Sequence, residues 1–175
     1  MTTRSSKAEI DARVAGLTVP KLFLQLVAEH PTVTLLRSMQ GEGGWNEYST
    51  GDVRGITAKA AAGLAAEGLD TGHRILLMMS NRPDFHWWDL AAQFMRATPV
   101  SIYNSSSPEE IHYLSHHAEA EIAILEDDSF LQRMLVVRDE LPELKKIFVI
   151  NPPEGPLPDG VFPVSDLLEH GEADL

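Results

Sequence analysis

The stretch IAILEDDSFLQRMLVVRDELPELKKIFVI, residues 122–150, contains one complete strand–helix–strand unit and decides the fold class. It begins and ends with four uninterrupted apolar residues, a pattern that indicates strands buried on both faces. Between these runs Phe130, Met134 and Val137 recur at helical spacing, and Pro142 ends the helix. Short apolar strands joined by an amphipathic helix are typical of right-handed crossovers between parallel strands.

The same alternation extends towards the N-terminus. Residues 74–79 and 98–103 are predicted strands, and a helix over residues 84–96 separates them. Pro99 counts against the second of these strands, because proline cannot donate a hydrogen bond to a sheet. We therefore expect an α/β fold with a doubly wound, Rossmann-like, mostly parallel sheet and helices on both faces.

The clearest helix start lies at Ser107. This serine can cap the helix, Pro108 suits the first helical position, and Glu110 completes a capping box. The inner face is predicted to be Ile111, Leu114 and Ala118.

The N-terminal third predicts a small β-hairpin before the α/β alternation. A helix follows Pro20, and residues 33–37 and 45–49 are predicted strands joined by the glycine-rich turn 41–44. Ser49 or Thr50 then begins a helix that ends at Gly68.

Three segments are expected along the chain. Residues 1–15 are polar and are predicted to be a loose N-terminal arm. Residues 16–150 are predicted to form the α/β unit. Residues 151–175 begin with a proline- and glycine-rich linker and end with a short element, a possible strand over 161–164 followed by a helical turn.

Composition excludes several classes of function. The formal charge of −12 argues against a nucleic-acid partner, and Lys145-Lys146 is the one pair of adjacent basic residues. The chain has no cysteine, no apolar run long enough to span a membrane and no signal-like N-terminus. We expect a cytoplasmic protein without a membrane span.

Polar residues follow two of the predicted strands, where parallel sheets usually bind ligands. These segments are Ser80–Pro83 and Asn104–Ser107. Neither segment has the glycines and lysine of a phosphate-binding loop. The serines are expected mainly to form a loop and to cap the helix that follows. The glycine-rich segment 41–44 carries an acid where a phosphate would lie, so it reads as a hairpin turn.

The sequence contains no group of residues with the pattern of a metal site or of a catalytic site. His112 and His116 share a helix face, but no third ligand is in view, and His117 points elsewhere. Asp127-Asp128 is expected to cap a helix, and Trp87-Trp88 to pack, with Trp88 in the core and Trp87 near an interface. We predict no catalytic, cofactor-binding or metal-binding residue.

The order of several segments resembles the N-terminal portion of the adenylate-forming (AMP-binding) enzyme superfamily. The segments are WNEYS (45–49), GHRI (72–75), NRPDF (81–85), ATPVSIY (97–103) and PEEIHYL (108–114). The segment 103–107 is more similar to bacterial fatty-acid–CoA ligases than to amino-acid-activating domains. His73 and Ala97 depart from the usual Asp and Gly of the family, in places that do not touch chemistry.

The resemblance implies a ligase that uses ATP, Mg²⁺ and coenzyme A to convert a fatty acid to its acyl-CoA through an acyl-adenylate. The family's Ser/Thr/Gly-rich loop ending in Lys, its later Thr-Glu, its ribose-holding Asp and its C-terminal Lys do not occur in this sequence. No catalytic residue is therefore carried over. The isolated chain is expected to bind no cofactor and to be inactive.

Alternative functions remain open at this stage. The chain is also compatible with another adenylate-forming enzyme, one that activates aryl or amino acids, or with a stand-alone flavodoxin-like binding or interaction module. The last needs a complete ligand site at the strand ends. If the chain is a fragment of a larger enzyme, it is expected to expose apolar surface meant for the missing domains, and copies of the chain are expected to associate through it.

Overall fold

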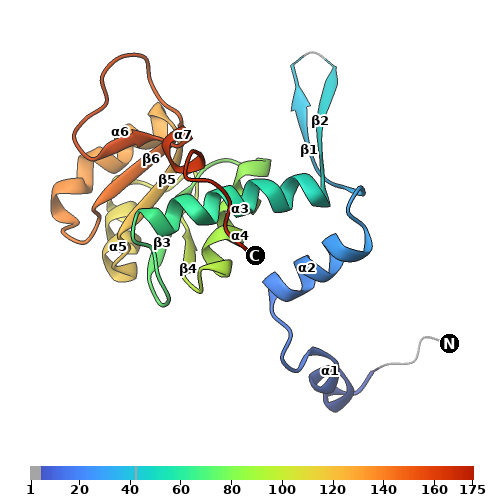
Figure 1. Ribbon diagram of the computed structural model, residues 1–175. Coiled ribbons are helices and arrows are strands. Elements are labelled where there is room, and N and C mark those ends of the chain that lie inside the picture. The colour runs from blue at the N-terminus through green and yellow to red at the C-terminus, as the bar shows by residue number, and fades with distance from the viewer. Residues whose placement is uncertain (1–4, 42) are drawn as a thin grey trace.

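A five-stranded parallel sheet lies at the centre of the structure, a computed structural model that describes residues 5–41 and 43–175. Its strand order is β4-β3-β5-β6-β7 (Figure 1). The strands are β3 (Arg74–Met78), β4 (Thr98–Ser101), β5 (Ile122–Asp127), β6 (Lys146–Asn151) and β7 (Val161–Pro163). The order reverses between β3 and β5, which confirms the predicted doubly wound α/β fold.

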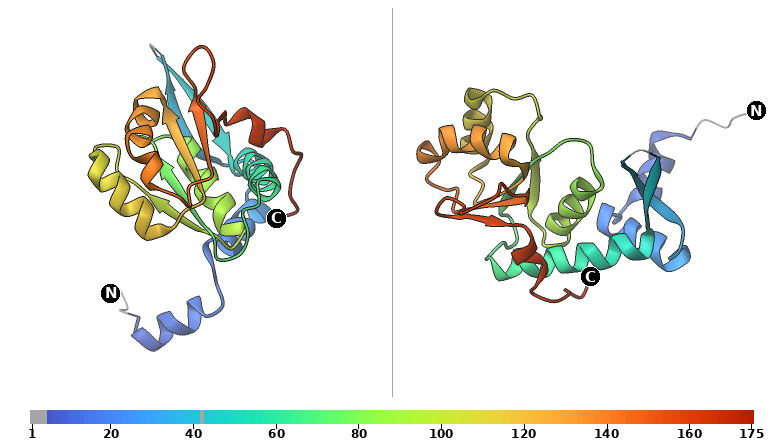
Figure 2. Two further views of the ribbon diagram at one scale, coloured as in Figure 1. Left: turned by 90° about the vertical axis from the view of Figure 1, so that its left-hand side faces the viewer. Right: turned by 90° about the horizontal axis from the view of Figure 1, so that it is seen from above.

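Helices cover both faces of this sheet. Helices α3 (Thr50–Ala66) and α4 (Pro83–Phe94) pack on one face, and α5 (Pro108–Ala118) and α6 (Asp128–Val137) pack on the other (Figure 2). Alternate residues of β3, β5 and β6 enter the two cores, because successive side chains of a strand point to opposite faces. In β3, Ile75 and Leu77 lie in the first core, whereas Leu76 and Met78 lie in the second.

The predicted β-hairpin is confirmed as the antiparallel pair β1 (Thr34–Gln40) and β2 (Gly44–Ser49). Part of its predicted turn, residue 42, lies outside the described residues. The hairpin stands away from the α/β body in Figure 1 and joins it at its base, where Tyr48 packs edge-on against Trp87 with ring centroids 5.5 Å apart. Both Trp87 and Trp88 are buried, so Trp87 belongs to the contact between hairpin and body.

The first two helices are α1 (Lys7–Val14) and α2 (Val19–Glu29). No regular structure is expected for residues 1–15, yet α1 forms there without a buried residue. A capping box between Ser6 and Glu9 and an ion pair of 2.7 Å between Lys7 and Asp11 explain it. Local side-chain pairs thus stabilise a helix that has no apolar face.

The C-terminal residues return to the body after an irregular stretch. The short 3₁₀ helix η1 (Arg138–Glu140) precedes β6, and α7 (Ser165–Leu168) follows β7 and lies against α3. The contact is close, because a Cβ atom on Gly63 would lie 2.0 Å from the carbonyl oxygen of Leu167. The amide of Ala173 then donates a 3.0 Å hydrogen bond to the carbonyl of Ala58.

Several local predictions are confirmed. Ser107 caps α5 with a complete capping box, and Ser49 does the same for α3. Pro99 lies in β4, an edge strand of the sheet, where its missing N–H leaves no gap in the interior. Across the residues that the structure describes, no helix combines the length and apolarity needed to cross a bilayer.

Candidate functional site at the carboxyl edge of the sheet

The carboxyl ends of β3, β4 and β5 form the edge at which doubly wound sheets bind ligands, with the binding crevice beside the strand reversal. Here the reversal lies between β3 and β5. The predicted segments Ser80–Pro83 and Asn104–Ser107 follow β3 and β4, and both reach this edge.

A side chain of the protein occupies the crevice between β3 and β5. Glu126, near the end of β5, accepts the backbone N–H of Ser80 at 2.6 Å through Oε2. Its Oε1 lies 3.3 Å from Nη1 of Arg82, and Nε of Arg82 also bonds Asp84 at 2.7 Å. The Arg82 and Glu126 side chains are only 22% and 17% exposed, so these ion pairs are partly desolvated. The backbone donor and the cation that could receive an anion are already engaged by carboxylates.

Beside this crevice a hollow of about 430 Å³ opens between the ends of β3 and β4. Its buried floor includes Met79 and Ile102, and Phe85 at the start of α4 forms one wall. Tyr103, 82% exposed, stands at the rim. The remaining lining residues are Ser80, Asn81, Ser101 and Asn104, so none of the residues that line the hollow is charged.

The loop that carries Tyr103 is held from α6. Nη1 of Arg133 donates to the carbonyl oxygens of Asn104 and Ser106, at 2.7 and 3.2 Å, while the guanidinium lies 4.7 Å from the ring centroid of Phe130. Sequence reasoning missed Arg133, because its partners are 27 and 29 residues away and no local pattern connects them. Ser106 is buried, so the predicted serine cluster acts mainly as a fixed loop leading into α5.

A second hollow of about 410 Å³ lies on the other side of Tyr103. Glu109, Glu110, Tyr113 and Leu114 line it together with Ser106. Its acidic residues give this part of the edge a negative charge.

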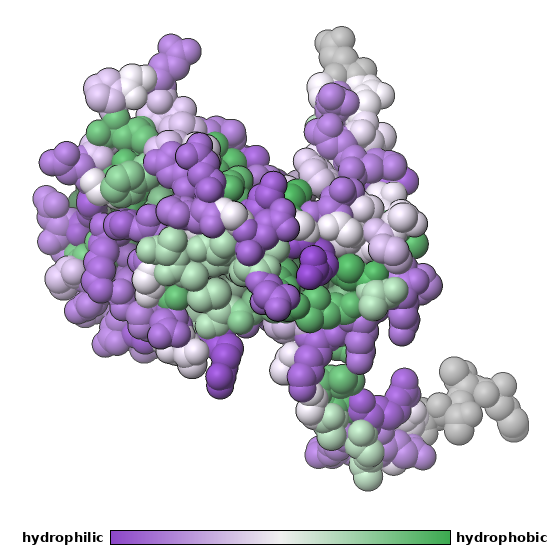
Figure 3. Space-filling view, in the orientation of Figure 1, coloured by the Kyte–Doolittle hydropathy of each residue, from purple (hydrophilic) through white to green (hydrophobic). Residues whose placement is uncertain are grey.

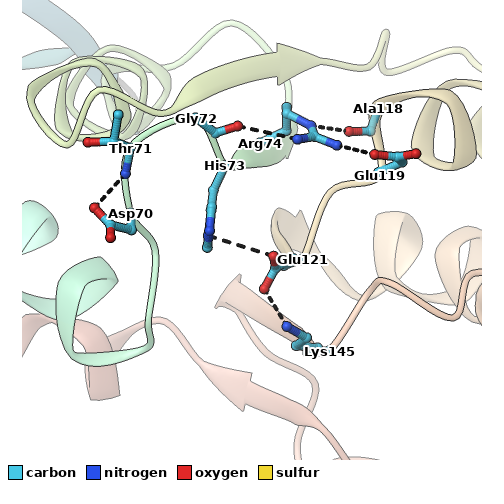
Figure 4. A network of polar contacts seen from close by, with 9 residues as sticks. All are labelled: Asp70, Thr71, Gly72, His73, Arg74, Ala118, Glu119, Glu121 and Lys145. Carbon is cyan, nitrogen blue, oxygen red and sulfur yellow. Dashed lines mark hydrogen bonds and ion pairs between the residues drawn. The ribbon is translucent and has the colours of Figure 1, made fainter.

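The amino edge of the sheet, at the opposite end, holds the network of polar contacts in Figure 4. Glu121 lies at its centre, with Oε2 2.5 Å from Nζ of Lys145 and Oε1 3.7 Å from Nδ1 of His73. The Lys145 hydrogen bond lowers the pKa of Glu121, and Glu121 in turn raises the pKa of Lys145. Arg74 pairs with Glu119 at 2.6 Å. These charges neutralise one another across the starts of three strands, which is a structural role.

The histidines of α5 form stacked pairs. His112 and His116 stack with ring centroids 5.8 Å apart, and His112 Nε2 lies 3.5 Å from Glu140 Oε2. His117 stacks on Tyr113 instead. Within residues 5–41 and 43–175, no group of three or more His, Cys, Asp or Glu side chains is arranged to hold a metal ion.

Of the acidic pair expected to cap a helix, Asp127 has this role at the start of α6, whereas Asp128 is the first residue of the helix. Asp127 accepts the backbone N–H groups of Ser129 and Phe130, at 2.9 and 3.4 Å. The carboxylate therefore satisfies donors of the first helical turn.

Comparison with known proteins identifies the family. The profile of the AMP-binding enzymes matches residues 23–164, most of the chain. The chain belongs to the AMP-binding enzyme family. Its sequence is 32% identical over 140 residues to a long-chain-fatty-acid–CoA ligase of Xenopus laevis, an alignment that covers 78% of this chain and 19% of that protein. An uncharacterized protein of Mycobacterium tuberculosis is 31% identical over 124 residues, covering 70% of this chain and 68% of that one.

Solved structures show the same fold. A crystal structure of an anthranilate CoA ligase with anthranoyl-AMP superposes with a TM-score of 0.79 at 19% identity, over 93% of this chain and 30% of the other. A long-chain-fatty-acid–CoA ligase from Archaeoglobus fulgidus gives a TM-score of 0.72 at 16% identity, over 89% and 30%. The chain spans about a fifth of the length of the curated ligases that it matches.

Proposed function

We propose that this chain is the N-terminal part of an ATP-dependent fatty-acid–CoA ligase. The observation that carries the proposal is its sequence identity to a long-chain-fatty-acid–CoA ligase. The chain covers 19% of that relative, which supports the view that the parts of the enzyme that perform the chemistry lie outside these 175 residues.

The proposed reaction has two steps. A carboxylate oxygen of the fatty acid bonds to the α-phosphorus of ATP, and the bond to the bridging oxygen breaks to release pyrophosphate. The thiol of coenzyme A then bonds to the acyl carbon, loses its proton, and expels AMP with the electrons of the broken acyl–oxygen bond. Bound Mg²⁺ would supply charge stabilisation at the phosphates.

The residues present at the carboxyl edge do not fit ATP and Mg²⁺. Glu126 engages both the backbone donor of Ser80 and the guanidinium of Arg82. A triphosphate needs donors and cations that are free to receive negative charge. We therefore propose that no residue of this chain acts catalytically, and that the isolated chain binds no cofactor and forms neither adenylate nor thioester.

The proposal is tested by sequencing the natural reading frame past the codon for Leu175 and assaying the encoded protein. A Ser/Thr/Gly-rich loop ending in Lys soon downstream, with pyrophosphate release that depends on a fatty acid, supports the ligase. A natural stop codon at that point overturns it, because the chain then acts alone.

A second candidate is an enzyme that activates aryl acids, which the close superposition on an anthranilate CoA ligase favours. The same assay separates the two when palmitate, decanoate, benzoate and anthranilate are compared as acid substrates. Faster turnover with benzoate or anthranilate would show that the enzyme activates an aryl acid rather than a fatty acid. A stand-alone flavodoxin-like module is disfavoured, because Glu126 fills the crevice such a module would use.

We further propose a cytoplasmic location and self-association of the isolated chain. Exposed apolar side chains lie on the hairpin, where Met39 and Trp45 face each other across the strands at 73% and 59% exposure. Figure 3 shows further apolar surface across the middle of the molecule, along α3. Sedimentation should detect a dimer that Trp45→Lys disrupts. A clean monomer at high concentration would exclude the association.

A further inference from the structure

The hollow between β3 and β4 is unlike a phosphate site in its charge. Two cations lie nearby, and both are engaged: Arg82 by Asp84 and Glu126, and Arg133 by the carbonyl oxygens of its loop. Arg82 carries one positive charge and its partners Asp84 and Glu126 carry two negative charges, so the three side chains together have a net negative charge. The acidic second hollow adds to this charge. An anion entering the hollow would be repelled by this charge, and the two cations named here are already paired.

The surfaces of the hollow favour a different ligand. Met79 and Ile102, 7% and 3% exposed, present an apolar floor, and Phe85 and the exposed ring of Tyr103 present apolar walls. Apolar surface of this kind gains free energy when a hydrocarbon displaces water from it. A volume of about 430 Å³ lies within the range of small-molecule pockets.

The hollow also contains neutral polar groups that can form hydrogen bonds with a ligand. Among the described residues, the side-chain amides of Asn81 and Asn104 make no hydrogen bond within the chain, although both residues line the hollow. Such amides donate to, and accept from, an uncharged oxygen without requiring a charge on the ligand.

We propose that this hollow binds an uncharged hydrocarbon chain that carries a neutral oxygen near its rim, and that it excludes phosphates. The identification of the bound hydrocarbon with the acyl group of a ligase substrate rests on the proposed function. The affinity of the hollow for hydrocarbon does not. The phosphates of the reaction are then held by residues outside this hollow.

The test is an NMR titration of the ¹⁵N-labelled 175-residue chain with 1-octanol and, separately, with ADP. Octanol should saturate the shifts of amides in residues 79–81 and 102–104, and ADP should leave them unchanged. Tyr103→Ser should weaken octanol binding roughly tenfold, because it removes one aromatic wall. Tyr113→Ser is the matched control: it also removes an exposed tyrosine, from the second hollow alone, and should change the affinity less than twofold.

Three outcomes would overturn the proposal. These are saturable shifts of the same amides with ADP, octanol shifts spread evenly over the chain, and equal effects of the two tyrosine variants. Because the substitutions are at exposed residues, circular dichroism should show that both variants fold. None of these outcomes bears on the ligase assay of the longer protein, so failure of this inference is distinguishable from failure of the proposed function.

Discussion

Gly63 is the position in α3 at which the C-terminal residues approach most closely. An alanine Cβ there would lie 2.0 Å from the carbonyl oxygen of Leu167, 2.7 Å from its carbonyl carbon and 2.8 Å from its Cα. These are backbone atoms, so no side-chain rotation relieves the overlap. Contacts below 3.0 Å are essentially never tolerated, and α7 must therefore move by about 1 Å or more.

Gly63→Ala should destabilise the chain by a net of about 1–2 kcal/mol. Overpacking of this kind costs about 1–3 kcal/mol, and the better helix propensity of alanine returns up to about 1 kcal/mol. For a chain of this size the melting temperature should fall by roughly 2–8 °C. Urea denaturation followed by circular dichroism measures the free energy of unfolding directly.

Gly55→Ala is the matched control for this prediction. Gly55 lies in the same helix, and a Cβ added there meets no atom within 4 Å, so this variant should gain up to about 1 kcal/mol. If Gly63→Ala is as stable as Gly55→Ala, the packing of α7 on α3 is wrong, and residues 151–175 are only an appended segment. The predicted division of the chain at residues 15 and 150 stays a prediction.

Three further substitutions test local electrostatics and capping by urea denaturation. Asp89→Asn should stabilise the chain by about 0.5 kcal/mol at pH 7. Burial raises the pKa of Asp89 above its ordinary value of 3.8. The charged carboxylate therefore destabilises the folded chain, and this cost grows as the pH rises from 3.8 through the raised pKa. The gain should disappear below pH 3; a gain that persists there would contradict the argument. Glu121→Gln should cost at most about 0.5 kcal/mol at pH 7, because the Lys145 hydrogen bond lowers the pKa of Glu121. This cost should fade as the pH drops below 4.5 and through the lowered folded pKa, so an equal loss at pH 3 would refute an electrostatic cause. Ser107→Ala should cost about 1 kcal/mol through loss of the α5 cap, and no loss would show that the loop is held by other contacts.

Signals within a few residues of each other made much of the fold predictable. The apolar runs at 122–125 and 147–150 are strands because a parallel sheet buries both faces, and the capping box at Ser107 forms as its spacing indicates. Helix α1 was not expected, because an apolar stripe is the usual signal and α1 is stabilised by polar pairs.

The carboxyl edge itself was predictable from topology, but its chemistry was not. The contacts of Glu126 with Ser80 and Arg82, and those of Arg133 with its loop, join residues 27 to 46 positions apart. Such partners are decided by the packing of strands and helices, and single-sequence periodicity carries no information about them. The sequence could show that phosphate loops are absent, yet only the structure shows a carboxylate in the crevice.

We propose that this chain is part of a ligase and that the groups which perform the chemistry lie outside it. The most direct measurement is pyrophosphate release by the isolated 175-residue chain with ATP, Mg²⁺, coenzyme A and a fatty acid. We expect no release above the rate without protein. Release that depends on the fatty acid and rises in proportion to the purified chain would contradict the claim, because catalytic groups would then lie within these residues.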